Sequence, residues 1–206
     1  MKQQPFTTVT GPAVSLMQAN IDTDTIIRIE RLTSIPRENL GQYALETLRY
    51  RADGSEDARC ALNRPEFQHA PFILAGPNFG CGSSREHAVW ALQGRGVRCV
   101  IAPQFGDIFE SNCFQNGVLA LRLPMAQVTE IAAQCIAGAA LTVNLEMQML
   151  RRPDGSELPF SIAETRRQAL LLGLDDIGLT LMLDAHIRAW QREDRGRRPW
   201  VWEIAQ

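Results

Sequence analysis

Two short apolar runs enclose a helical segment near the middle of this chain, and that order constrains the fold more than any other feature. The runs Phe72–Ala75 and Val97–Ala102 are apolar and rich in β-branched residues, which predicts strands buried on both faces. Residues 84–94 between them have a helical pattern. A strand, helix, strand order implies a crossover between parallel strands. The sequence therefore predicts an α/β fold with a central, largely parallel sheet flanked by helices.

Further elements extend this pattern on both sides. Strands are predicted at Ala13–Met17 and Val118–Leu123, and helices at Ile108–Asn116 and Met125–Cys135, with Pro124 at the start of the second helix. Asn112–Gly117 is interpreted as a helix end with its glycine stop.

After residue 140 the sequence predicts a β-hairpin and then helices. Strands Leu141–Leu150 and Glu157–Phe160 flank an Arg-Pro-Asp-Gly turn. Ser161 and Glu164 have capping-box spacing for a helix that ends at Gly173, and a last helix begins at Asp184. We expect a single domain over residues 1–206, with a mobile loop around 36–65 and a helical C-terminal extension over 161–195.

Composition excludes several classes of function. The net charge is −2 with no long basic block, so nothing favours nucleic-acid binding. The longest apolar runs are too short to cross a membrane, and the first nineteen residues lack a signal-peptide pattern, so we expect a cytoplasmic protein. The five cysteines include no C-x-x-C pair and the three histidines lie far apart, so we expect no metal or iron–sulfur cluster held by this chain alone.

The segment Gly80–His87 has the features of an anion site that contains a hydroxyl group. Its glycines allow a tight turn, and Ser83 and Glu86 have the spacing of a capping box that opens the following helix. Helix starts attract negative oxygen, and Arg85 adds a guanidinium suited to a carboxylate or phosphate. The segment follows the first strand of the strand–helix–strand unit, where open α/β sheets bind ligands. The alternative is an ordinary capped helix after a glycine turn. Cys81 could line the site, but a small buried filler is the favoured interpretation.

A second polar cluster lies early in the chain, at Asn20–Ile27. Asp22 and Asp24 flank the hydroxyl of Thr23 directly after a predicted strand. Asp and Asn side chains often bind backbone groups in such places, so an Asx-type turn is the simpler interpretation.

Four segments together resemble one known family, the small subunits of 3-isopropylmalate dehydratase, which are the separate swivelling domain of the aconitase superfamily. These segments occur in the family's order and cover the chain from about residue 15 to residue 190; they are residues 20–27, 78–88, 100–112 and 173–181. The resemblance implies a swivelling β/β/α domain of aconitase type.

The resemblance also implies a hydro-lyase reaction, the reversible loss and re-addition of water on a hydroxy dicarboxylic acid such as 3-isopropylmalate, in leucine biosynthesis. In this family a [4Fe–4S] cluster on a separate large subunit binds the substrate. This chain would thus bind no cofactor itself and would act with that large subunit in a heterodimer or heterotetramer. By the same resemblance Ser83 is the catalytic base, and Ser84 and Arg85 bind the substrate carboxylate. Thr23 and Asp24 are expected to belong to the substrate-binding site, where they contact partner residues or orient the acid and base groups on the cluster side.

The chain departs from the family pattern at two places. The family usually has a proline and an aromatic residue where Arg28 and Arg31 stand here, with Leu32 retained. Two added positive charges could change which acid is accepted, so a methylated or shorter malate is an alternative substrate.

Two functions of other classes remain open. One is a serine hydrolase built on Ser83, although His87 lies on the same helix and no G-x-S-x-G motif is present. The other is a non-catalytic binding module that kept the fold. If the chain closes over a partner's cluster, residues 20–60 and 76–87 should form an exposed face.

Overall fold

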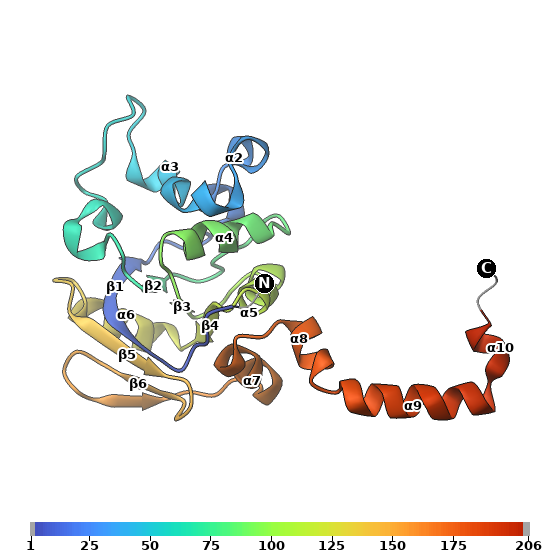
Figure 1. Ribbon diagram of the computed structural model, residues 1–206. Coiled ribbons are helices and arrows are strands. Elements are labelled where there is room, and N and C mark those ends of the chain that lie inside the picture. The colour runs from blue at the N-terminus through green and yellow to red at the C-terminus, as the bar shows by residue number, and fades with distance from the viewer. Residues whose placement is uncertain (1–2, 204–206) are drawn as a thin grey trace.

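The computed structural model describes residues 3–203 and contains a seven-stranded mixed sheet (Figure 1). The strand order is β4-β3-β2-β1-β5-β6-β7. The first four strands are parallel to one another: β1 Thr8–Leu16, β2 Phe72–Ala75, β3 Cys99–Ala102 and β4 Leu119–Arg122. The other three pair antiparallel beyond β1: β5 Ala140–Asn144, β6 Met149–Arg151 and β7 Glu157–Pro159. The predicted α/β class is confirmed, and the strand–helix–strand unit forms the centre of the parallel half of the sheet.

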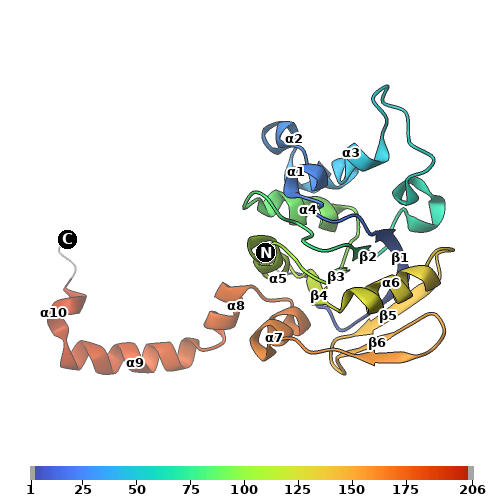
Figure 2. The ribbon, with the colours of Figure 1, turned by 180° about the vertical axis from the view of Figure 1, so that it is seen from behind.

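The parallel half is buried because helices cover both of its faces. Every residue of β2 and β3 is buried, as the continuous apolar runs predict. The crossover helices α4, Glu86–Gly94, and α5, Asp107–Gln115, contact each other, whereas α6, Met125–Gln134, packs across β1, β2 and β3 (Figures 1 and 2). This arrangement places the carboxyl ends of β1 and β2 at the start of α4.

Short helices fill the segment between β1 and β2, where the sequence predicted mainly irregular structure. They are α1 Thr23–Ile26, α2 Ile29–Ser34, η1 Arg37–Tyr43, α3 Glu46–Arg49, η2 Ala61–Asn63 and η3 Pro65–Phe67. The segment packs on α4 through η1, where a Cβ added at Gly41 would lie 2.2 Å from the carbonyl carbon of Gly94. Leu40, Leu45 and Leu62 are buried in the core. The mobility of residues 36–65 stays a prediction.

Both predicted capping boxes are wrong. Helix α4 begins at Glu86 rather than after Ser83, and its N-cap residue Arg85 makes no side-chain capping bond. Helix α7, Glu164–Leu172, likewise has an N-cap without such a bond, and the Glu164 carboxylate pairs with Arg167 instead. In both places the glutamate of the motif is bound elsewhere, Glu86 by Asn116 and Glu164 by Arg167. The predicted glycine stop is confirmed, since Gly173 ends α7 with φ 64°.

The predicted hairpin is confirmed around residues 152–156, which join β6 and β7. The strand expected over 141–150 is wrong as a single element, because a turn separates β5 from β6. In that turn the Asn144 side chain accepts a bond from the Met147 N–H at 2.8 Å, and Gln148 has φ 52°.

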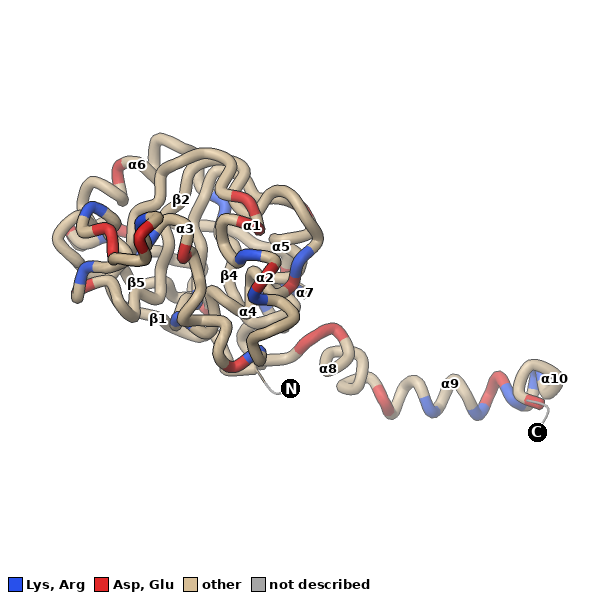
Figure 3. The backbone as a smooth tube through the Cα atoms, turned by 90° about the horizontal axis from the view of Figure 1, so that it is seen from above, with Lys and Arg blue, Asp and Glu red and all other residues tan. Residues whose placement is uncertain are grey.

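The C-terminal part projects from the body as a helical arm (Figures 1 and 2). It contains α8 Asp176–Leu181, α9 Asp184–Arg197 and α10 Pro199–Trp202. The predicted start of α9 at Asp184 is confirmed. Side chains of both charges lie along α9 (Figure 3), where Arg188 pairs with Asp184 at 2.7 Å. Within residues 3–203 no helix is long and apolar enough to cross a membrane.

Candidate functional site

The loops that leave β1 and β2 lie side by side beyond the carboxyl ends of these strands. The Gly80 N–H donates to the Ile21 carbonyl at 2.7 Å, and the Thr23 N–H donates to the Cys81 carbonyl at 2.9 Å. These bonds continue the parallel pairing of β1 with β2 past the end of the sheet. The two polar clusters singled out in the sequence, residues 20–27 and 80–87, therefore form one site.

Glycine at position 80 is required by both the backbone and a neighbouring ring. Gly80 has φ 72°, a left-handed conformation that side chains disfavour. A Cβ at this position would lie 2.2 Å from Cγ of Phe109 in α5. Because glycine has no side chain, the loop can pass directly over α5, and this contact helps to set the position of Ser83, three residues further along the chain.

The Thr23 hydroxyl ties the two loops together at the centre of the site. Thr23 is 1% exposed, and its Oγ1 accepts a bond from the Ser83 N–H at 3.1 Å. The Asp22 carboxylate accepts from the Thr25 N–H at 2.7 Å and caps α1, which confirms the Asx-type interpretation for this residue. Hydrogen bonds from Thr25 hold the pKa of Asp22 below its usual value.

Asp24 and Arg85 form an ion pair between the same two loops. The Asp24 side chain is 55% exposed, whereas that of Arg85 is only 18% exposed. The carboxylate therefore orients a guanidinium that is largely packed against the protein, and solvent reaches the pair from the Asp24 side.

Ser83 and Ser84 are exposed at the mouth of the site. In the described part of the chain their hydroxyl groups make no hydrogen bond to protein. The N-terminus of α4 begins two residues after Ser84 and has no side-chain cap, so its first N–H groups are open to an anion. Exposed hydroxyls, an oriented guanidinium and an open helix end together suit a carboxylate ligand.

The surroundings of Ser83 do not resemble a serine hydrolase. The His87 ring packs on Trp90 with centroids 4.5 Å apart, and across residues 3–203 no histidine is bonded to Ser83. Cys81 is half-buried beside the site rather than the buried filler that was expected, because its loop runs along the protein surface.

The cysteines of this chain do not fit a cluster ligand set. Cys99, Cys113 and Cys135 are buried in the core, and burial raises the pKa of all three thiols, to about 11 for Cys135. Residues 3–203 contain no group of three or more histidine, cysteine or acidic side chains placed to hold a metal ion.

Arg28 and Arg31, the two departures from the family pattern, are both bound to acidic side chains. Arg31 makes a two-pronged pair with Glu46, at 3.1 and 3.0 Å, and Arg28 pairs with Glu30 at 3.1 Å and with Glu46 at 3.7 Å. The Glu46 side chain is 11% exposed, so it lies within the protein and offsets much of the added charge.

The structure also reveals a residue that the sequence interpretation missed. Asn116 was placed only at the end of a helix, and Gly117 does stop α5 there with φ 75°. Its buried side chain, however, bonds to Glu86 at the start of α4. An asparagine before a glycine at a helix end is ordinary, so no local signal could have indicated this contact.

Comparisons with known proteins found related families and relatives. The family model of the aconitase C-terminal domain matches residues 3–126, and that of the C-terminal domain of the 3-isopropylmalate dehydratase small subunit matches residues 176–201. A 3-isopropylmalate dehydratase small subunit from Cereibacter sphaeroides is 47% identical over 201 residues, and one from Paramagnetospirillum magneticum is 44% identical over 200 residues. Each alignment covers 96% of this chain and all of the relative.

A solved structure has the same fold. The crystal structure of 3-isopropylmalate dehydratase from Methanocaldococcus jannaschii superposes with a TM-score of 0.67 at 22% identity, over 88% of this chain and 99% of the other.

Proposed function

This chain belongs to the family of 3-isopropylmalate dehydratase small subunits, and on that premise we propose that it forms part of the active site of a two-subunit hydro-lyase. The reaction is the reversible dehydration of 3-isopropylmalate in leucine biosynthesis, as the family name implies. The convergence of Thr23, Asp24, Ser83 and Arg85 at the ends of β1 and β2 is the observation that supports this assignment.

In this proposal Ser83 is the catalytic base. Its Oγ takes the proton from the carbon next to a substrate carboxylate, while the hydroxyl group leaves from the neighbouring carbon. A neutral serine is a weak base, so its alkoxide needs a positive environment. Arg85 and the open N-terminus of α4 supply that environment, and the Thr23 bond to the Ser83 N–H holds the loop in place.

The substrate carboxylate binds to Ser84 and Arg85. As the proton leaves, negative charge builds on this carboxylate, and donors already aimed at it stabilise the charge without rearrangement. Asp24 keeps the Arg85 guanidinium oriented when the site is empty. Thr23 and Asp24 thereby act on the substrate indirectly, Thr23 by holding Ser83 and Asp24 by orienting Arg85.

A small subunit requires a partner subunit, and we propose that this partner is the large subunit of the same dehydratase. The ligand set that this chain lacks would then reside on the partner, whose [4Fe–4S] cluster supplies Lewis-acid chemistry at the leaving hydroxyl group. The two subunits form a heterodimer or a heterotetramer with the exposed Ser83 face turned toward the cluster. A biosynthetic enzyme of this kind acts in the cytoplasm.

We assign 3-isopropylmalate rather than a shorter malate as the preferred substrate. The alternative depended on free positive charge at Arg28 and Arg31, but their pairs with Glu30 and Glu46 offset that charge. Turnover of 3-isopropylmalate should exceed that of methylated or shorter malates, and a clear preference for a shorter acid would restore the alternative.

Anaerobic co-purification of the tagged chain with its partner, followed by iron analysis and a hydratase assay, tests the proposal. We expect an iron-containing complex whose turnover falls by orders of magnitude in Ser83→Ala, with assembly intact. The matched variant Ser161→Ala, at another exposed serine, should keep full activity. A partnerless protein without activity would instead indicate a binding module, and unchanged turnover in Ser83→Ala would remove Ser83 from the mechanism.

A further inference from the structure

The side chain of Asn116 lies at the C-terminal end of α5 and is 6% exposed. We propose that it is a positioning residue, which holds the first turn of α4, and with it Arg85, in the conformation that the reaction requires. This inference rests on the proposed function and names a part of the site that lies outside the residues already assigned to it.

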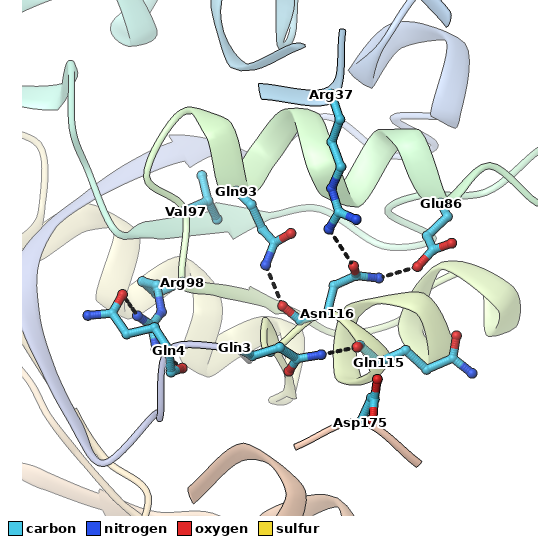
Figure 4. Close-up of a pocket in the computed structure, with 11 residues that line it drawn as sticks. Gln3, Gln4, Arg37, Glu86, Gln93, Val97, Arg98, Gln115, Asn116 and Asp175 are labelled. Carbon is cyan, nitrogen blue, oxygen red and sulfur yellow. Dashed lines mark hydrogen bonds between the residues drawn. The ribbon is translucent and has the colours of Figure 1, made fainter. Parts of the chain in front are cut away.

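The Asn116 amide makes four hydrogen bonds, to partners on three elements; Figure 4 shows those with Arg37 and Glu86. Its Oδ1 accepts from Arg37 Nη2 at 3.1 Å and from Trp90 Nε1 at 3.0 Å. Its Nδ2 donates to Glu86 Oε1 at 2.6 Å and to the Asn112 carbonyl at 2.9 Å. The amide therefore joins η1, α4 and α5 at one buried point.

The bond to Glu86 connects this network to the site. Glu86 is the first residue of α4 and follows Arg85 directly in the chain. Its carboxylate is the group that a capping box would turn back toward Ser83, but Asn116 holds it on the opposite side of the turn. The Ser83 N–H, to which a capping-box glutamate would bond, donates to Thr23 instead, and the Glu86 carboxylate ties the first turn of α4 to Asn116.

A second connection runs through Arg37 to the segment between β1 and β2. Arg37 is the first residue of η1, and its guanidinium stacks 4.2 Å from the centre of the Trp90 ring. Asn116 accepts hydrogen bonds from both side chains, so η1 and α4 share one anchor. Movement of either element changes the geometry of the same amide.

No other side chain of this size can replace the amide. A carboxylate at position 116 retains the two acceptor contacts to Arg37 and Trp90 but places negative charge 2.6 Å from the Glu86 oxygen. An apolar side chain leaves several buried groups without partners, which costs about 1–3 kcal/mol for each group. The carboxylate variant is therefore the more specific test, because it changes charge with little change in shape.

The test uses the complete complex with the large subunit and measures kcat and KM separately. In Asn116→Asp we expect kcat/KM to fall at least about tenfold near neutral pH, because Glu86 is repelled. Two carboxyl groups this close share a proton as the pH falls, and the proton restores the lost donor. The deficit relative to the unaltered complex should consequently shrink as the pH falls.

A double variant separates positioning from general loss of structure. In Glu86→Gln with Asn116→Asp the donor and acceptor are exchanged, so the hydrogen bond reforms with reversed polarity. The contact to the Asn112 carbonyl stays lost, so we expect the double variant to recover part of the lost kcat/KM and to lose the pH dependence of the deficit. Asn144→Asp, in which the acceptor role of the side chain toward Met147 is retained, serves as the matched control and should behave like the unaltered protein.

The outcomes are distinct. Unchanged kcat/KM in Asn116→Asp would overturn the inference, as would a deficit that neither pH nor Glu86→Gln alters. A thermal melt of each variant measures how much folded protein is present, and activity is expressed per folded complex. Failure of the unaltered complex to dehydrate any hydroxy dicarboxylic acid would instead refute the proposed function itself.

Discussion

Asp24 and Arg85, which are 61 residues apart in sequence, form an ion pair that joins two loops. The pair lies where β1 and β2 end, and the less exposed member is the arginine. Surface ion pairs contribute little to stability, about 0–1 kcal/mol, so the consequence of this pair is mainly geometric. It presets the direction of a guanidinium before any carboxylate arrives.

Asp24→Asn should therefore weaken substrate binding more than it weakens folding. We expect KM for the hydroxy acid to rise by about threefold to tenfold, the range of a single charge-assisted contact, with the melting temperature nearly unchanged. Steady-state kinetics of the complex measures the first quantity and thermal denaturation the second. Glu157→Gln, which breaks an exposed pair with Arg151 on the antiparallel side of the sheet, is the control and should leave KM unaltered.

Thr23→Val should reduce activity while the protein stays folded. Valine has the shape of threonine but cannot accept the bond from the Ser83 N–H. Loss of one such hydrogen bond costs about 1 kcal/mol of stability, measurable by urea denaturation. Because the Ser83 loop then loses its anchor, we expect a larger effect on kcat than on the free energy of unfolding. Thr23→Ser keeps the acceptor, so equal losses in both variants would contradict the proposed role of this bond.

The sequence predicted the parallel half of the fold well because its signals are local. β2 is a continuous apolar run with observed bounds equal to the predicted ones, and α5 and α6 follow helical patterns to within one residue at each end. The short helices between residues 23 and 67 have no comparable pattern. They are stabilised by tertiary packing, η1 and α1 on α4 and η2 and η3 on β1, so only the folded structure reveals them.

In the candidate site, too, local features could be predicted from the sequence, whereas long-range contacts could not. The residues proposed for the site follow from the motifs, but their contacts with one another do not. Ser83 fits a capping box in sequence, yet its backbone binds Thr23, and the Glu86 carboxylate binds Asn116. These partners lie 60 and 30 residues away along the chain, beyond the reach of any local pattern.

Cys81 should be reactive in the native chain while the core cysteines are protected. Iodoacetamide attacks thiolates, and burial raises the pKa of Cys99, Cys113 and Cys135 and blocks access to them. Mass spectrometry of the native protein should find the label on Cys60 and Cys81, which are half-buried, and on all five cysteines after unfolding. Partner binding should protect Cys81 more than Cys60, and equal protection of both would argue against closure over the Ser83 face.

Gly80→Ala should destabilise the protein through two separable effects. The left-handed backbone alone costs an alanine about 1–2 kcal/mol, and the new methyl group also meets the Phe109 ring, which adds about 1–3 kcal/mol of overpacking. Gly155, with φ 85° and no atom within 4 Å of an added Cβ, provides the matched control, since Gly155→Ala has the backbone effect alone. Urea denaturation of both variants gives the difference in unfolding free energy.

Phe109→Leu in the Gly80→Ala background then isolates the contact itself. A smaller side chain at position 109 creates space for the methyl group, so the double variant should lose less stability than the sum of the two single variants. The difference measures the coupling between the Ser83 loop and α5. Additive losses would mean that the loop shifts away from Phe109 without cost in free energy. The position of Ser83 would then be set by the hydrogen bonds of its loop to Thr23 and Ile21 alone.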